Sequence, residues 1–211
     1  QRLHHRQVLA LRRAIDLLPF VERTDALLDL HSMHEPGPPL LLTGPHERNI
    51  ALARRLATPR HVIVDAGHTE GRRLRDHGRF GSPTSQAESL LIECGWHGDM
   101  ASRFVARDLC ARFLVATGAI DENDLPHAWR LAAPARQQVL DVTRAITARS
   151  NDTRFAQPWT SGQCIVEAGT VLGWREDEAF VTPYDDCTLV MPSLRQLRPG
   201  VTVMRLGRQR S

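Results

Sequence analysis

The stretch Ala26–Ser32, ALLDLHS, decides how the first half of the chain is expected to fold. Its apolar residues lead directly to Asp29 and His31, and a loop rich in proline and glycine follows. A short apolar run bounded by turn residues is typical of a buried strand in an α/β protein. Because Asp29 and His31 are two residues apart, we expect them on one face near the carboxyl end of the strand. Open α/β sheets bind ligands beyond that end.

The pair of Asp29 and His31 favours two interpretations. An imidazole beside a carboxylate is a plausible metal ligand. A D-x-H sequence by itself is more typical of a buried, hydrogen-bonded histidine. The rest of the chain has to decide between them.

Further strands and helices follow in alternation. Apolar runs predict buried strands over 40–44, 61–65 and 89–93, and helical spacing of apolar residues predicts helices over 2–18, 46–57 and 101–117. Pro19 is expected to end the first helix. This order predicts an α/β fold with a mixed sheet flanked by helices.

The run 89–98, SLLIECGWHG, repeats the pattern of the opening stretch. An apolar strand brings Glu93 to its far end, where glycines follow. Glu93 is either a general acid/base or a structural carboxylate held by backbone N–H groups, and spacing alone does not separate these interpretations. The catalytic interpretation requires the strands of Glu93 and His31 to lie close together.

Composition changes after about residue 133, where short β-prone runs separated by turn residues predict a small all-β module. We therefore predict two parts, 1–132 (α/β) and 133–211 (β-rich). The second part resembles the folded-over β-sandwich of biotinyl and lipoyl carrier modules. A carrier needs a modifiable lysine, and all 27 basic residues here are arginine, so a carrier function is excluded.

Composition limits the remaining function classes. The net charge of +3 is too small and evenly placed to favour a nucleic-acid partner. No apolar run approaches the ~20 residues of a membrane span, and no signal peptide is evident, so we expect a cytoplasmic protein without a membrane partner. The four scattered cysteines are expected to be reduced thiols, because they form no C-x-x-C motif.

The order of motifs resembles that of the succinylglutamate desuccinylase/aspartoacylase family, relatives of the zinc carboxypeptidases. The matching features are D-L-H-S at 29–32, L-L-I-E-C-G at 90–95, a helix and a β module. The resemblance implies part of a zinc-carboxypeptidase-like sheet followed by a barrel-sandwich-like module. It also implies one zinc ion that serves hydrolysis of the amide bond in an N-acyl amino acid or related small amide. His31 would be its third protein ligand and Glu93 the general acid/base.

The sequence departs from the family pattern at the zinc motif. The H-x-x-E segment that supplies two zinc ligands before D-L-H is absent, as is the following asparagine/arginine substrate motif. His4 and His5 are followed three positions later by Gln7 and Val8, and His68 has its glutamate at the wrong spacing. We favour a fragment whose two further zinc ligands lie in a segment outside this sequence, because Gln1 is an unusual first residue. The chain alone is then expected to be inactive.

Several residues receive secondary roles in this hypothesis. Asp29 is expected to orient His31 rather than bind zinc. The long polar loop over 67–88 offers Arg72, Arg73 and Arg79 to a substrate carboxylate. We predict Arg79 and His68 as substrate-binding residues, and His34, His68 and His97 are further candidates for the lining of the site.

Two alternatives remain open. The chain is either the deacylase described above or a non-catalytic binding or structural protein that keeps the fold without zinc. A weaker third interpretation is a different metallohydrolase that uses His31 with His68 or His97. The partner expected for the enzyme is a small amide, and a homo-oligomer is possible.

Overall fold

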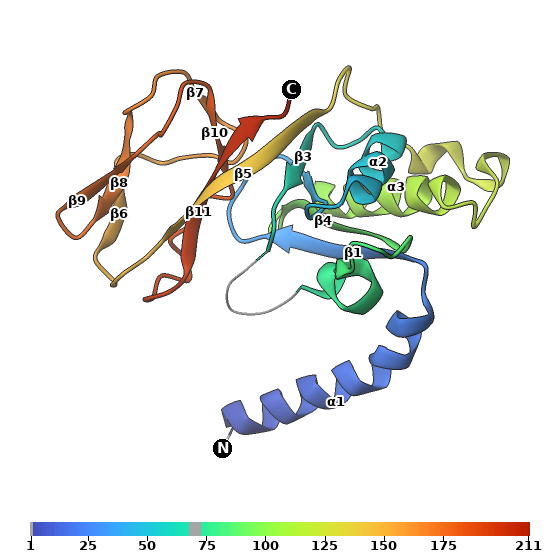
Figure 1. Ribbon diagram of the computed structural model, residues 1–211. Coiled ribbons are helices and arrows are strands. Elements are labelled where there is room, and N and C mark those ends of the chain that lie inside the picture. The colour runs from blue at the N-terminus through green and yellow to red at the C-terminus, as the bar shows by residue number, and fades with distance from the viewer. Residues whose placement is uncertain (1, 68–72) are drawn as a thin grey trace.

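The computed structural model describes residues 2–67 and 73–211 and contains one large mixed sheet (Figure 1). Its eight strands are ordered β1-β4-β2-β3-β5-β11-β10-β7. Their bounds are β1 Ala26–Met33, β4 Glu88–Trp96, β2 Leu40–Leu42, β3 His61–Val64, β5 Gln138–Thr147, β11 Thr202–Gln209, β10 Cys187–Val190 and β7 Cys164–Ile165. The predicted strands around Asp29 and Glu93 are confirmed, as is the mixed α/β class. The expected burial of the first strand is wrong, because β1 is an edge strand and is only partly buried.

Strand direction changes along the sheet. The pairs β1–β4, β2–β3 and β3–β5 are parallel, whereas β4–β2 and the pairs from β5 to β7 are antiparallel. The parallel pair β1–β4 brings the two motif-bearing strands side by side. His31 lies opposite Glu93 in its register.

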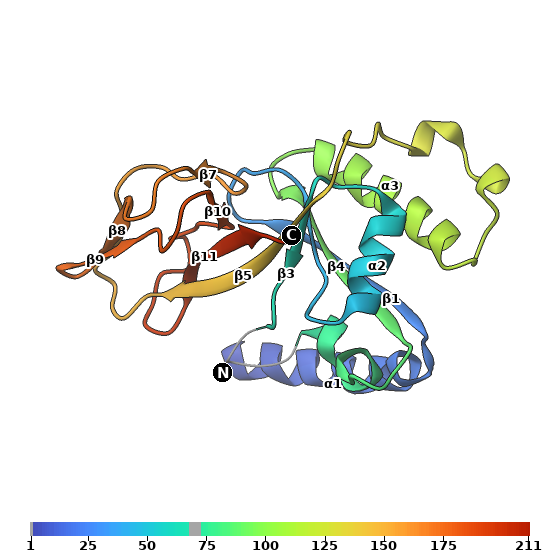
Figure 2. The ribbon, with the colours of Figure 1, turned by 45° about the horizontal axis from the view of Figure 1, so that its top comes forward.

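Helices α2 (Glu47–Leu56) and α3 (Ala101–Ala116) cover one face of the sheet, as Figure 2 shows. Alternate strand residues, including Leu41, Leu90 and Ile92, pack with the helices into one apolar core. Leu40, Leu42 and Leu91 belong to a separate apolar cluster on the other face. This alternation follows from the two-residue period of a strand. It leaves the second face available for a site.

The β-rich part continues the same sheet. β5 pairs with β3 on one side and with β11 on the other, so the large sheet crosses the expected boundary near residue 133. A second sheet contains β6 (Thr153–Phe155), β8 (Val171–Arg175) and β9 (Glu178–Val181). The barrel-sandwich form of this part and its division from the first part both stay predictions.

Helix α1 (Arg2–Arg23) continues past Pro19, so the expected end at that residue is wrong. Side chains close its last turn, because Arg23 Nε donates to the Pro19 carbonyl at 3.1 Å and Thr24 Oγ1 to that of Phe20 at 2.7 Å. The helix runs below the sheet in Figure 1, with Leu11 and Ile15 exposed. No described helix is both long and apolar enough to cross a membrane.

Short 3-10 helices complete the connections. Leu74–Asp76 and Gly78–Gly81 precede β4, and Glu122–Asp124 and His127–Trp129 lie between α3 and β5. The first of these places Arg75 in the interior of the protein, where its side chain is fully buried.

Candidate functional site

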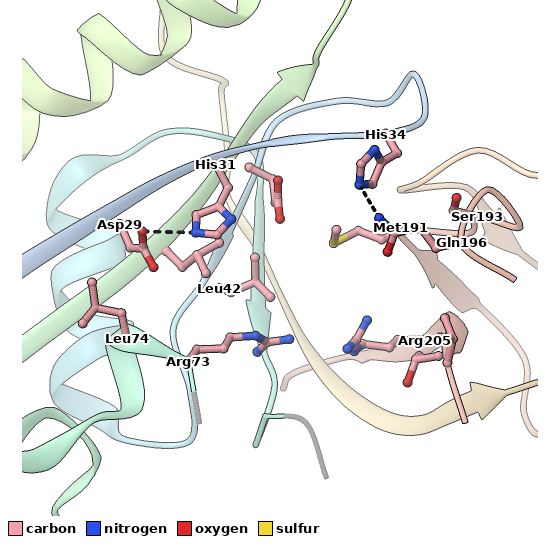
Figure 3. A pocket seen from close by; sticks show the side chains of 14 residues that line it. Asp29, His31, His34, Leu42, Arg73, Leu74, Met191, Ser193, Gln196 and Arg205 are labelled. Atoms are coloured by element: carbon pink, nitrogen blue, oxygen red, sulfur yellow. Dashed lines mark hydrogen bonds and ion pairs between the residues drawn. The ribbon is translucent and has the colours of Figure 1, made fainter. Parts of the chain in front are cut away.

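A cavity of about 370 Å³ opens on the sheet face opposite α2 and α3 (Figure 3). Its walls come from β1, β4, the segment before β4, and the β10–β11 region. The lining residues are Asp29, His31, His34, Leu42, Arg73, Leu74, Leu91, Glu93, Met191, Ser193, Gln196, Val201, Thr202 and Arg205. Both motif strands therefore bring their polar residues to one cavity.

Asp29 and His31 lie on one face of β1, as their spacing predicts. Asp29 Oδ1 is 3.1 Å from His31 Nε2, and the His31 side chain is about half exposed at 47%. A carboxylate bound to one ring nitrogen fixes the orientation of the ring and leaves Nδ1 for another partner. This geometry supports the orienting role of Asp29, which stays a prediction.

Glu93 is the buried carboxyl group of the cavity. Only 8% of the residue is exposed, and its Oε2 atom has no hydrogen-bond partner among the described residues. Burial raises the pKa of Glu93, and this effect exceeds the opposing influence of His31 and Arg73. A carboxyl group in this environment holds a proton more readily than one in water. That property is required of a general acid/base.

Arg73 and Arg205 approach each other on another side of the cavity (Figure 3). Arg73 Nη2 lies 3.0 Å, and Arg205 Nε 3.1 Å, from the same oxygen, Oδ2 of Asp65. Burial favours the neutral form of Asp65, but the two arginines outweigh it and lower the pKa of that carboxyl. Asp65 also accepts a hydrogen bond from the Gly67 amide at 3.1 Å.

Arg75 and Asp76 extend this charged cluster behind the cavity. Arg75 Nη2 donates to the Asp65 carbonyl at 2.9 Å and lies 3.4 Å from Asp76 Oδ2. Burial lowers the pKa of Arg75 to about 10, so the guanidinium remains charged at neutral pH. Burial raises the pKa of Asp76. Arg73, Arg75 and Arg205 thus gather with the carboxylates of Asp65 and Asp76 in one charged cluster.

The other predicted site residues are distributed differently. Arg79 Nη2 is 2.7 Å from Asp25 Oδ1, and Arg79 is not among the described residues that line the cavity. His68 and Arg72 lie outside the described residues. His34 lines the cavity, and His97 lines a second one beside α3. The substrate-binding roles of Arg79 and His68 stay predictions.

Sequence reasoning missed Arg205 and Gln196. Arg205 lies in β11 with only 6% of its surface exposed, between residues that are themselves buried. A guanidinium inside an apolar strand needs a buried partner, and this was the available signal. Nothing local in the sequence marks Gln196.

The described residues do not by themselves fit a catalytic zinc ion. Such an ion takes three protein ligands and leaves one position open. His31 offers one nitrogen, and no group of three histidine, cysteine, aspartate or glutamate residues in the described part of the chain is placed to hold a metal.

The fold is shared with solved structures of succinylglutamate desuccinylases and aspartoacylase-family proteins, the group that the motif order resembles. The Vibrio cholerae succinylglutamate desuccinylase matches with a TM-score of 0.68 over 96% of this chain, at 16% identity. A succinylglutamate desuccinylase/aspartoacylase from Rhodobacter sphaeroides matches with a TM-score of 0.62 over 91% of this chain, at 15% identity. Likenesses at these identities establish the fold.

A product-bound ectoine utilization protein from Ruegeria pomeroyi also matches, with a TM-score of 0.57 over 89% of this chain and 12% identity. The chain spans 59%, 60% and 59% of the lengths of these three proteins. No protein-family model matches the sequence, and neither does any curated protein.

Proposed function

We propose that this chain carries part of the active site of a hydrolase that cleaves the amide bond of a small N-acyl amino acid or related amide. The observation that carries the proposal is the placement of Glu93. It lies opposite His31 in two adjacent parallel strands, at the wall of one cavity. The likeness of the fold to desuccinylase structures supports the same class of reaction.

Glu93 is assigned the proton transfers of this reaction. As a carboxylate it accepts a proton from the attacking water, and as a carboxylic acid it gives that proton to the leaving amine. Its burial supports this role, because a raised pKa narrows the free-energy difference between the two forms near neutral pH. His31, held by Asp29, lies across the strand pair.

The two arginines in the cavity wall, Arg73 and Arg205, support a substrate that carries a carboxylate. Arg73 and Arg205 both contact the carboxylate of Asp65, and Arg75 lies behind them. Carboxylates bind guanidinium groups through paired hydrogen bonds. We assign this side of the cavity to a carboxylate of the substrate.

Zinc belongs to the proposal as the expected cofactor, with His31 as one ligand. Since the described residues supply no complete ligand set, two further ligands would have to come from outside them. We therefore expect this chain to contain much less than one zinc ion per molecule and to hydrolyse neither N-succinylglutamate nor N-acetylaspartate. Elemental analysis and amine release measure these two quantities. Stoichiometric zinc held by residues of this chain alone would contradict the expectation.

The catalytic role is tested in a form of the protein that does bind zinc. Glu93→Gln is expected to keep the zinc content and lower kcat by ~10²–10⁴-fold, because glutamine cannot accept the proton. His31→Ala is expected to lose zinc and activity together. Near-normal kcat in Glu93→Gln would make Glu93 a structural carboxylate. Calorimetric binding of the same amides without turnover in the zinc-loaded form would favour a non-catalytic binding protein.

A further inference from the structure

A second group of reactive side chains extends from the wall of the first cavity, where His34 and Gln196 lie, to Ser32 and His97 beside α3. One continuous series of side-chain hydrogen bonds joins four residues, in the order Ser32, His97, His34 and Gln196. Ser32 Oγ is 2.7 Å from His97 Nδ1, His97 Nε2 is 3.1 Å from His34 Nδ1, and His34 Nε2 is 2.9 Å from Gln196 Nε2. A hydroxyl, a base and a group that orients the base are the parts of an activated serine nucleophile.

The two imidazoles are held in a fixed arrangement. Their rings meet edge to face at 87°, with centroids 4.6 Å apart. The His97 amide donates to the Met33 carbonyl at 3.0 Å, which ties the loop after β4 to the end of β1. Beside His34, Glu35 Oε1 accepts from Arg195 Nε at 2.9 Å and from Ser193 Oγ at 3.2 Å. These contacts hold the segment of His97 on one side of the hydrogen-bonded series and the segments of His34 and Gln196 on the other.

Ser32 opens into a cavity of about 340 Å³ between β1 and the start of α3. Leu30, Met100 and Ala106 contribute apolar surface to its walls, and Arg103 contributes a cation. The volume suits a short acyl group next to the hydroxyl.

We propose that Ser32 is the nucleophile of a metal-independent esterase site for short-chain carboxylic esters, with His97 as its general base. Ser32 Oγ attacks the ester carbonyl carbon and gives its proton to His97 Nδ1. The carbon–oxygen bond to the alcohol breaks, and His97 returns the proton to the leaving alcohol. Water then cleaves the acyl-serine by the same route, which releases the acid and restores the hydroxyl.

Gln196 sets the direction of the hydrogen bonds, and His34 and Gln196 are therefore positioning residues. When Gln196 Nε2 donates to His34, both histidines carry hydrogen on Nδ1, and His97 donates to Ser32. A half-turn of the amide presents its oxygen to His34 instead. Each hydrogen then moves to Nε2, and His97 Nδ1 becomes free to accept the Ser32 proton.

The test measures covalent labelling of the whole chain by a fluorophosphonate probe in EDTA, with the labelled residue identified by mass spectrometry. We expect Ser32 to be labelled, Ser32→Ala to abolish labelling, and His97→Gln to slow it ~10²-fold or more. Ser82→Ala is the matched control, because that hydroxyl bonds to Thr84 at 3.2 Å and is not among the described residues that line either cavity. Its labelling rate should equal that of the unmodified chain.

Gln196→Glu separates activation from simple packing. A carboxylate at this position can only accept from His34, so the variant should label faster than the unmodified chain. It should also move the acid limb of the pH–rate profile to higher pH, since the carboxylate stabilises the protonated imidazoles. Labelling elsewhere, equal rates in Ser32→Ala, or an unchanged rate and pH limb in Gln196→Glu would overturn the proposal.

Discussion

The two faces of the large sheet differ in chemistry although the same strands form both. Under α2 and α3 the face is apolar, with Leu90 and Ile92 of β4 fully buried. On the other face the next residue of β4 is Glu93, at the wall of a cavity that also contains Arg73 and Arg205. One strand thus stabilises the fold on one side and presents a reactive group on the other.

The two faces also differ in how burial affects stability. Removal of apolar side chains from water stabilises the helix-covered face without any specific partner. Burial of charged groups on the cavity face costs free energy, and only pairing offsets that cost. The free energy of unfolding should therefore fall when side-chain volume is removed from the helix-covered face. On the cavity face it should fall when a charge is removed.

Loss of charge should have the largest effect at Asp65. Asp65→Asn removes the carboxylate that Arg73 and Arg205 share, so we expect the free energy of unfolding to fall by ~3–5 kcal/mol. Denaturant unfolding measures this quantity. Asp25→Asn is the control, because its pair with Arg79 is exposed and should contribute no more than ~1 kcal/mol. Similar losses in the two variants would contradict the assigned role of burial.

The next largest loss of stability is expected when side-chain volume is removed at Ile92. Ile92→Ala leaves a cavity in the apolar core and should lower the free energy of unfolding by ~2–5 kcal/mol. Leu30 is its register partner across β1–β4, yet Leu30 is 45% exposed and Ile92 is fully buried. Leu30→Ala should therefore cost clearly less in the same denaturant measurement. Equal losses of unfolding free energy in the two variants would show that the face of β4 beneath the helices is less tightly packed than the burial of Ile92 indicates.

Local pattern was sufficient to predict the elements that carry His31 and Glu93. The side chains of a strand repeat every two residues, so the spacing of Asp29 and His31 is enough to place both on one face. The adjacency of β1 and β4 was a condition of the catalytic interpretation, and the register of the two strands satisfies it.

Contacts between segments that are distant in the sequence could not be predicted from local sequence pattern. Arg205 meets Asp65 only because β11 joins the sheet through β5, and no periodicity in the sequence contains that pairing. Gln196 reaches His34 from the loop before β11 for the same reason. The end of α1 was mispredicted because the helix continues through Pro19 to Arg23. Its last turn has two side-chain hydrogen bonds, from Arg23 and Thr24 to backbone carbonyls.

The smallest expected change in stability is at Glu93, the residue that follows Ile92 in the sequence. Because burial raises the pKa of Glu93, the folded chain binds this proton more tightly than the unfolded chain does. The stabilisation is fully present below the ordinary value of 4.5 and is lost as the pH rises through the higher folded-state pKa. Glu93→Gln has no such loss, so the variant should be the more stable protein at neutral pH.

Denaturant unfolding of both proteins from about pH 4 to about pH 8 measures the difference between their free energies of unfolding. Each unit by which the pKa of Glu93 is raised contributes ~1.4 kcal/mol to this difference. The advantage of Glu93→Gln should shrink as the pH falls and be absent in acid. Glu88→Gln on the same strand is the control, because its carboxylate accepts from Arg55 Nη2 at 2.7 Å and its replacement should bring no gain at neutral pH. A difference that stays constant with pH would mean that Glu93 is ionised in the folded chain as readily as in water. The cavity face would then lack the raised pKa that supports the proton transfers assigned to Glu93.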